Sequence, residues 1–542
     1  MNTRKVVMLV ALLASVDACA VDGSDASDTN DAADDSTNDV SMMDESTAAS
    51  DLDAVFARHG DDQHNRLPNN VPVGDATGVF TTVSSHGFID LNNEFFQDLG
   101  TNGRRCVSCH VPTSGWTVSP KQLQTVFDAT DGGKFDDGFG LSAVFRPVDG
   151  ANAPNADVST LAKRRQAYSL LLNKGLIRIH LAIPTGAEFE LVAVDDPYHF
   201  ATADNMSLYR RPPPTTNLKF DSTIMWDGRE NAVGQTIAQD LATQANDAHL
   251  THAQGTPLTQ AQRESIVNFE TALVSAQIFD RTAGDLRAAG ARGGIDAILA
   301  QEFHIGINDN FGDPVTGKPF NPVVFNIFDR WTNIGLGQKD CDHDHDHDRD
   351  DRCRCDRDDH GHGHDRDDRD CDRDDRDDGI NAARRAVARG QALFNTLPIT
   401  ITGVSGINDE AAFGKPAKLI GTCTTCHDTP NGGNHSVAAP LNIGLVDASR
   451  RTPDMPLYTL RNKTTGETIK VTDPGRALVD GKWAHIGRFK GPILRDLAPR
   501  APYFHNGFAK DLDAVVDFYD DRFDLKLTKQ QHSDLVSFLH SL

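Results

Sequence analysis

The chain carries one hydrophobic pattern twice, once near its middle and once at its end. The segment LTQAQRESIVNFETAL at 258–273 aligns without gaps with LTKQQHSDLVSFLHSL at 527–542. In each copy, apolar residues recur three or four positions apart, as they do along one face of an α-helix. The matching apolar pairs are Ile266/Leu535, Phe269/Phe538 and Leu273/Leu542. Both segments are therefore predicted to be amphipathic helices.

The polar residues around these segments support the same prediction. Thr259 and Thr528 each precede a helical pattern and are followed three residues later by a glutamine, Gln262 or Gln531. This spacing is typical of a capping box, in which both residues satisfy free backbone N–H groups. Helical spacing also predicts helices at 380–395 and 512–521, the second with Leu512, Val515, Val516 and Tyr519 on one face. The repeat thus predicts two related, mostly helical domains.

Two segments lack any such pattern. Residues 21–75 are rich in Asp, Ser, Thr and Ala, with few large apolar side chains, which predicts a disordered tether. Residues 336–379 contain a run of Asp, Arg, His, Cys and Gly that cannot bury a core, which predicts a disordered loop. This run is either a solvated charge run or a loose site for divalent metal. It separates two predicted domains, at 76–335 and 380–542.

The first twenty residues have the pattern of a secretory signal peptide. Arg4 and Lys5 precede an apolar run that ends in small residues, and the run is too short for a transmembrane helix. A second interpretation makes Cys19 the lipidated cysteine of a lipoprotein. We therefore expect an exported protein without a transmembrane segment, either periplasmic or lipid-anchored at the cell envelope.

The net charge of −25 comes mostly from the two segments without a hydrophobic pattern. Residues 21–53 carry eleven acidic side chains and no basic one, and residues 340–378 carry nineteen Asp and eight Arg. The rest of the chain is nearly neutral and contains no basic stripe. We therefore expect no binding to nucleic acid.

Two short motifs carry the chemistry: CVSCH at 106–110 and CTTCH at 423–427. Cysteines three apart share one face of a helical turn, where they can form thioethers to both vinyl groups of one haem. The following histidine then reaches the iron. Alternatives are a disulfide, a zinc site or a redox pair, but zinc needs more ligands and a redox pair does not need the histidine. The motifs predict two covalent haem c groups, held by Cys106, Cys109 and His110 and by Cys423, Cys426 and His427.

Two further motifs indicate a family. MWDGRE at 225–230 follows the first cysteine motif, and APYFHNG at 501–507 follows the second. Together the four motifs resemble the bacterial di-haem cytochrome c peroxidase family, including its MauG-type branch, from about 85 to 542. The resemblance and the repeat predict a mainly α fold. It would have two cytochrome c-like helical domains, each with one covalent haem, and long loops with disordered insertions.

The resemblance implies roles for individual residues. The N-terminal haem would be peroxidatic, the C-terminal haem would relay electrons, and Trp226 would lie between them. Tyr519 matches the position of the second-haem axial ligand, which is methionine in plain peroxidases and tyrosine in the MauG-type branch. Met455 is the alternative ligand. The family's interdomain calcium uses an asparagine where this chain has Arg211. Calcium is therefore an open alternative that the backbone carbonyls of Arg500 and Pro502 would hold.

The distal group of the first haem is predicted from the repeat. Tyr519 lies eight residues before Leu527, and the same offset from Leu258 leads to Leu250. His249 and His252 flank that position and are candidates for a distal acid–base group. His199 is the alternative cap for the resting iron.

The expected function is therefore a di-haem peroxidase. Hydrogen peroxide would be reduced at the N-terminal haem, with electrons relayed through the C-terminal haem from a small cytochrome or copper protein. Three alternatives remain open. They are a MauG-like oxidase of a protein or organic substrate, a non-enzymatic electron-transfer cytochrome, and a metal-sequestering lipoprotein.

Overall fold

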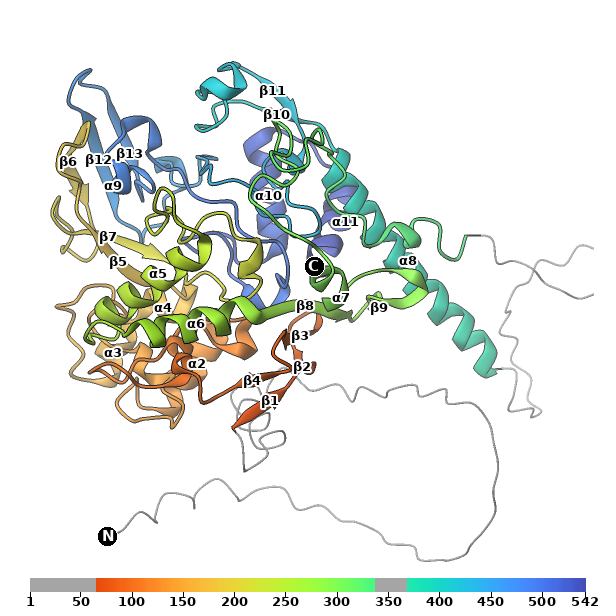
Figure 1. The fold of residues 1–542 in the computed structure, drawn as a ribbon, viewed down its shortest axis with the longest axis horizontal. Helices are drawn as coiled ribbons and strands as arrows, with labels where there is room; N and C mark the ends of the chain where they lie inside the picture. Colours follow the sequence, from red (N-terminus) through yellow and green to blue (C-terminus); the bar gives the residue numbers. More distant parts are fainter. Residues whose placement is uncertain (1–64, 337–367) are drawn as a thin grey trace, which may run out of the picture. The chain divides into compact units, whose positions relative to one another are not determined.

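The computed structural model of the chain describes residues 65–336 and 368–542 (Figure 1), with side chains in the second range described from residue 378. The predicted signal peptide, most of the tether and most of the Asp/His/Arg-rich loop lie outside the described residues. Predictions about export, lipidation at Cys19 and metal binding by that loop therefore stay predictions.

The two copies of the hydrophobic pattern form the helices α6 (Gln260–Ala272) and α11 (Lys529–His540). Both capping boxes are present, with Thr259 and Thr528 accepting from the backbone N–H three residues later. The apolar faces of both helices are buried. The predicted helices and their starts are thus confirmed, because spacing and caps are local properties that the sequence alone fixes.

Each repeat helix follows another helix in the chain. The helix α5 (Ile237–Thr251) precedes α6, and α10 (Leu512–Phe523) precedes α11. The helix predicted at 380–395 is the end of the longer α8 (Asp368–Thr396), which packs against α11. The shorter helices are α2 (Pro120–Ala129), α3 (Leu161–Ala167), α4 (Ser169–Lys174), α7 (Ile295–Leu299) and α9 (Ala477–Asp480).

The described residues also contain strands in five antiparallel sheets, which the sequence analysis did not predict. Most of these strands are short and lack a long alternation of apolar and polar residues, so their pairing depends on partners far away in the chain. The strands are β1 (Arg66–Pro68), β2 (Val71–Gly74), β3 (Gly78–Ser84), β4 (Phe88–Asp90), β5 (Ile177–Leu181), β6 (Phe189–Asp195), β7 (Met206–Arg210), β8 (Leu273–Asp280), β9 (Gly284–Asp285), β10 (Ile399–Ile401), β11 (Leu419–Gly421), β12 (Leu457–Asn462) and β13 (Thr468–Val471).

Two predicted boundaries need correction: the end of the tether at residue 75 and the end of the Asp/His/Arg-rich loop at residue 379. Strands β1 and β2 lie within 66–74, which the sequence assigned to the tether, and β2 pairs with β3. The helix α8 begins at Asp368, inside the segment that was predicted to be a loop up to 379. Polar composition was a poor guide here, because backbone pairing and helix propagation do not require apolar side chains at every position.

One sheet connects the two predicted domains. Strand β6 pairs with β12, with Phe189 opposite Asn462 and Val194 opposite Tyr458, and β12 also pairs with β13 (Figure 1). Phe189, Tyr458 and Leu460 are buried in one core cluster that both halves of the chain supply. The two halves therefore share a core, and their assignment as separate cytochrome c-like domains stays a prediction.

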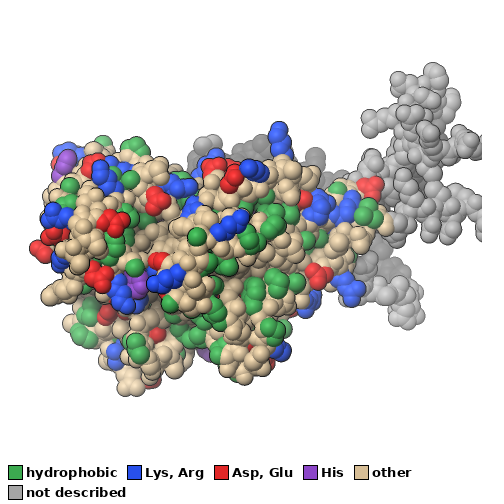
Figure 2. All heavy atoms as spheres, turned by 90° about the horizontal axis from the view of Figure 1, so that it is seen from above, with side chains coloured by type: hydrophobic (Ala, Val, Ile, Leu, Met, Phe, Trp, Pro, Cys, Tyr) green, Lys and Arg blue, Asp and Glu red, His purple; other side chains and the backbone are tan. Residues whose placement is uncertain are grey.

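The surface mixes both charges. On the face seen in Figure 2, Lys and Arg side chains alternate with Asp and Glu side chains and with hydrophobic ones. None of the helices within residues 65–336 and 368–542 is both long and apolar enough to cross a membrane.

Candidate functional site

Each cysteine motif forms one tight turn. In the first, a 3₁₀ helix spans Cys106–Ser108 and the backbone N–H of His110 donates to the carbonyl oxygen of Cys106 at 3.0 Å. In the second, the helix spans Cys423–Thr425 and His427 N–H donates to Cys423 at 3.1 Å. Each motif therefore presents its two thiols and its histidine from a single turn, as the spacing predicted.

The ring orientation of both histidines is fixed in the same way. Nδ1 of His110 lies 3.3 Å from the carbonyl oxygen of Trp116, and Nδ1 of His427 lies 2.6 Å from that of Gly433. A carbonyl accepts only from a protonated Nδ1, so the lone pair of each ring lies on Nε2. Burial lowers the pKa of both histidines to about 4. Both rings are therefore neutral at pH 7 and can ligate a metal through Nε2.

Each histidine also packs against the same arrangement of aromatic rings. The ring centroids of His110 and Phe95 are 6.3 Å apart, and Phe95 lies 5.1 Å from Phe269 on α6. In the second half, His427 and Phe394 are 6.0 Å apart, and Phe394 lies 5.7 Å from Phe538 on α11. Phe269 and Phe538 are the residues that the sequence repeat aligns. The structure thus builds the same histidine site twice.

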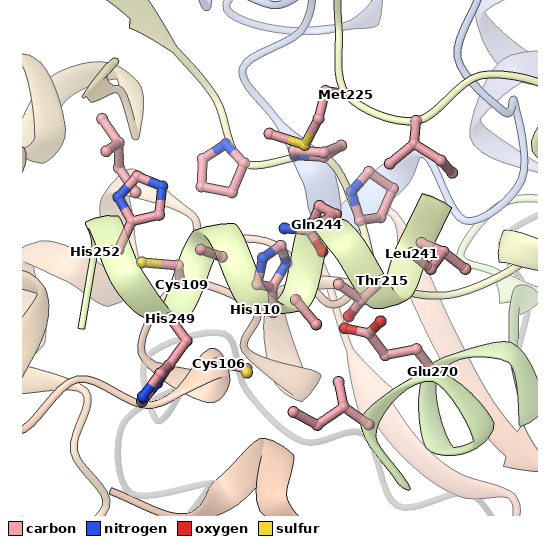
Figure 3. A pocket seen from close by; sticks show the side chains of 18 of the residues that line it. Cys106, Cys109, His110, Thr215, Met225, Leu241, Gln244, His249, His252 and Glu270 are labelled. Atoms are coloured by element: carbon pink, nitrogen blue, oxygen red, sulfur yellow. The ribbon is translucent and has the colours of Figure 1, made fainter. Parts of the chain in front are cut away.

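Each motif opens into its own cavity. The first cavity, of about 160 Å³, is lined by Cys106, Cys109 and His110, and the second, of about 250 Å³, by Cys423, Cys426 and His427 (Figure 3 shows the first). All four cysteines are free thiols, so neither motif forms the alternative disulfide. Burial raises the pKa of Cys109, Cys423 and Cys426 to about 12 and that of Cys106 further. Reactive redox cysteines have lowered values instead.

The apolar face of α10 lines the second cavity with Leu512, Val515, Val516 and Tyr519. No group in the described residues accepts a hydrogen bond from the Tyr519 hydroxyl, and burial raises its pKa. Met455 lies in a different cluster, with Leu170, Leu176 and Tyr209. The structure therefore brings Tyr519, and not Met455, to the cavity of the second motif. Its role as a ligand stays a prediction.

The helix α5 has the same position in the first cavity. Its lining residues Leu241, Gln244, Ala245 and Ala248 have the spacing of Leu512, Val515, Val516 and Tyr519 on α10. Ala248 therefore takes the place of Tyr519. The sequence repeat had placed the counterpart of Tyr519 at Leu250, two residues too late. The reason is that the connection from α5 to α6 is longer than that from α10 to α11.

Of the candidate histidines, His252 and His249 both line the first cavity, and His199 lines neither. Nδ1 of His252 is hydrogen-bonded to the buried carboxylate of Asp149, which also forms an ion pair with Arg104. The carbonyl oxygen of His252 accepts from Arg104 at 3.2 Å. These bonds hold the His252 ring in one orientation and leave its Nε2 free for proton transfer.

The carboxylate beside His252 is kept charged by its neighbours. Burial by itself raises the pKa of Asp149, but Arg104 and His252 bring it below the usual value. No carboxylate of the described residues is hydrogen-bonded to the His249 ring, which packs tightly against Gly255. Figure 3 shows the His249 and His252 rings directed to different sides of α5. Of the two, His252 has the geometry of an acid–base group.

Trp226 lies between the two cavities, because its side chain lines both. Its indole Nε1 donates to the carbonyl oxygen of Arg211 at 2.8 Å. The rest of the W-D-G-R motif holds this position: buried Asp227 accepts from Arg210 and Arg229. Gly228 has a φ of +68°, which glycine adopts without strain. The structure thus places Trp226 beside both cavities, and its role as a bridge between two haems stays a prediction.

The chain is similar to cytochrome-c peroxidases over part of its length. It is 30% identical to the cytochrome-c peroxidase IdrP2 of Denitromonas iodatirespirans over 132 residues, which are 22% of this chain and 36% of the relative. It is 28% identical to the cytochrome-c peroxidase IdrP1 of Pseudomonas sp. (strain SCT) over 182 residues, which are 30% of this chain and 41% of that relative. No family model matches the chain. These partial matches support a cytochrome c peroxidase family without distinguishing its MauG-type branch.

The residues of both cavities fit a covalently attached haem. Each cavity combines two free thiols at the required spacing with a histidine whose Nε2 is available. In the part of the chain that the structure describes, no group of three or more His, Cys, Asp and Glu side chains is arranged to hold a metal ion. The zinc alternative for the cysteine motifs therefore has no support in the described residues.

Sequence reasoning missed two buried residues around these cavities, Asp149 and Glu270. It noted Arg211 only as a departure from the family's asparagine and did not predict its contacts. Asp149 carries no recognisable motif, because its partner His252 lies far away in the chain. Glu270 could have been found from the repeat, since the aligned position in the second copy is Leu539. The Glu270 carboxyl lines the first cavity, its Oε2 has no hydrogen-bond partner among the described residues, and burial raises its pKa to about 8.

Proposed function

We propose that the chain is a di-haem peroxidase that reduces hydrogen peroxide at the cavity of Cys106, Cys109 and His110. The observation that carries this proposal is the difference between the two cavities on matching helices. Tyr519 projects from α10 into the second cavity, whereas Ala248 takes that place on α5 in the first. A methyl group cannot ligate a metal and leaves space for a small substrate opposite His110.

When bound, a haem supplies the redox-active iron at which peroxide is reduced. His110 and His427 would ligate the iron through Nε2, and the cysteines would hold each haem by thioethers. His252 would take a proton from one peroxide oxygen at Nε2 and return it to the other, oriented by Asp149. Each peroxide consumes two electrons and two protons and yields two waters.

The electrons would come from a small exported cytochrome or copper protein and pass from the second cavity to the first. Trp226 lies on this route because it lines both cavities. The relatives named cytochrome-c peroxidase support the same reaction class. The pattern of the first twenty residues supports action outside the cytoplasm.

A MauG-like oxidase is the second candidate, and Tyr519 is the observation that favours it. The resemblance places tyrosine at this position in that branch, and a tyrosine ligand stabilises ferric iron. Peroxide-dependent oxidation of a reduced small cytochrome, at a higher rate than that of any protein or organic substrate, would distinguish the peroxidase from the oxidase.

The proposal is tested by exchanging the residues that differ. In the haem-loaded protein, an open first site should give a high-spin ferric signal. Ala248→Tyr should close this site, remove that signal and abolish peroxide reduction. Ala248→Ser, which adds only a hydroxyl, is the matched control and should keep both. If Ala248→Tyr reduces peroxide at the wild-type rate, the first cavity is not the peroxidatic site.

The distal base is tested by a second pair of variants. His252→Ala should lower the peroxide reduction rate by about 10²-fold or more, the usual effect of losing a general acid–base group. His249→Ala should change it little, because that ring is not hydrogen-bonded to a carboxylate in the described residues and is directed to another side of α5. Equal losses in both variants would contradict the assignment of His252.

A further inference from the structure

The side chain of Arg211 connects three separate chain segments. Its guanidinium donates to the carbonyl oxygens of Val118 at 2.7 Å, Lys174 at 2.8 Å and Arg500 at 3.1 Å. The residue is buried and lines both cavities. Val118 and Lys174 belong to the first half of the chain and Arg500 to the second, so a single side chain bridges the two halves.

This guanidinium is a buried charge that pairs with no carboxylate side chain of the described residues. No carboxylate within residues 65–336 and 378–542 forms an ion pair with Arg211, and the carbonyl dipoles are its hydrogen-bond acceptors. Burial lowers its pKa to about 10, so it stays charged at pH 7. A cation that is surrounded by carbonyl oxygens from several segments has the chemical environment of a bound metal ion.

These residues do not fit the calcium ion that the family resemblance implies. Calcium binds oxygen ligands at about 2.3–2.6 Å, and the Arg211 side chain provides no oxygen where the family has an asparagine. Of the two carbonyl oxygens that remained as calcium ligands, those of Arg500 and Pro502, the first already accepts from the guanidinium. A divalent cation on the same oxygen would lie close to another positive charge in a buried site, which is strongly unfavourable.

The main chain of Arg211 also holds the residue between the cavities. Its N–H donates to the carbonyl oxygen of His505 at 2.7 Å, and its carbonyl oxygen accepts from Nε1 of Trp226 at 2.8 Å. The anchored guanidinium therefore fixes the backbone segment to which the indole is bound.

We propose that the guanidinium of Arg211 takes the place of a metal ion between the two halves of the chain and positions Trp226 between the two cavities. Arg211 is thus a positioning residue, and its importance for electron transfer rests on the proposed function. The junction between the halves then needs no added cation.

The first test is calcium dependence of the full-length, haem-loaded protein. Isothermal titration should show no stoichiometric calcium binding, and the thermal unfolding midpoint should be the same in EGTA and in excess calcium. Stoichiometric binding that raises the midpoint would overturn the proposal.

The second test uses a matched pair of buried arginines. Arg495 also donates to three main-chain oxygens, those of Gly294 at 2.9 Å, Leu542 at 3.1 Å and Asn431 at 3.3 Å, but it does not line the first cavity. Arg211→Met and Arg495→Met should both lower the unfolding midpoint. Only Arg211→Met should shift the ultraviolet resonance Raman band that reports the indole N–H hydrogen bond of Trp226, identified by subtraction of a Trp226→Phe spectrum.

Arg211→Lys keeps the charge with fewer donors, so it should fold and show a smaller shift of the same band. An unchanged Trp226 band in both Arg211 variants, or an equal change in Arg495→Met, would overturn the positioning role. None of these readouts requires peroxide. A protein that passes them without reducing peroxide would contradict the proposed function and not the role of Arg211.

Discussion

At the scale of single residues, the two cavities differ in a few side chains at matching positions. Tyr519 in the second cavity corresponds to Ala248 in the first, and Leu539 in the second corresponds to Glu270 in the first. The first cavity thus lacks a phenol and gains a carboxyl. The same helical framework can therefore form a cavity that leaves space for a small ligand, beside Ala248, and a cavity that a tyrosine side chain enters, at Tyr519.

The proposed ligand role of Tyr519 gives a prediction for the haem-loaded protein. Tyr519→Phe should remove the low-spin ferric signal of the second haem and raise its reduction potential, because a tyrosinate ligand stabilises ferric iron. Electron paramagnetic resonance and a redox titration measure both. Tyr503→Phe is the control, since Tyr503 lines the same cavity but donates its hydroxyl to Leu497 at 2.9 Å. An unchanged signal in Tyr519→Phe would exclude the tyrosine as ligand.

Glu270 gives a prediction for the pH dependence of stability. Its folded pKa of about 8 lies above the ordinary value of 4.5, so between these values the folded state holds a proton that the unfolded state releases. The stability that depends on this proton is complete below about pH 4.5 and is lost as the pH rises toward 8. Glu270→Gln should remove this loss, which is on the order of a few kcal/mol.

Urea unfolding at pH 5 and pH 8 measures the effect of Glu270. The exposed Glu264 on the same helix is the control, and Glu264→Gln should follow the wild-type pH dependence. If Glu270→Gln loses as much stability as the wild type between these pH values, another group is responsible.

At the scale of elements, the paired helices α6 and α11 repeat their capping boxes as well as their apolar faces. Thr259→Ala and Thr528→Ala should each destabilise the protein by about 1 kcal/mol, because each removes a side-chain acceptor for a free N–H group. Thr271→Ala removes only a bond within α6, to the carbonyl oxygen of Val267, and should have a smaller effect. Denaturant midpoints compare all three variants, provided that the slope of the unfolding free energy against denaturant concentration is constant. A loss of stability in Thr271→Ala as large as in the two cap variants would contradict the capping argument.

At the scale of the whole molecule, the two halves of the described chain are held together by a shared sheet and a buried ion cluster. Arg210 donates to both oxygens of Asp473 at 2.8 and 2.9 Å and to Asp227, and all three side chains are buried. Arg210 and Asp227 come from the first half and Asp473 from the second. The halves should therefore unfold together, in one calorimetric transition.

Arg210→Met should destabilise the protein by about 3–5 kcal/mol, because it leaves the buried Asp473 carboxylate without its arginine and the buried Asp227 carboxylate with Arg229 alone. Arg287→Met is the control: Arg287 forms an exposed pair with Asp285 at 3.0 Å, and its loss should cost less than about 1 kcal/mol. Scanning calorimetry measures both. Two separate transitions in the wild type, or equal effects of the two substitutions, would show that the cluster does not connect the halves.

The sequence by itself determined the features that depend on near neighbours. The helices α6, α10 and α11, the capping boxes of α6 and α11 and the two cysteine–histidine turns all follow from spacings of three or four residues, which the geometry of a helical turn converts directly into structure. The position of Trp226 followed from family resemblance and not from spacing. The short strands β1 and β2 were missed because their pairing partners, and not their own pattern, stabilise them.

Only the tertiary structure decided which distant residues meet. The register of α5 depends on the length of the connection after it, so the gapless repeat placed Leu250 where the structure has Ala248. The Asp149–His252 pair, the bridge from Arg211 to Val118 and Arg500, and the pairing of β6 with β12 join residues far apart in sequence. Such contacts form because burial requires a partner for every polar group, and the identity of that partner depends on the complete fold.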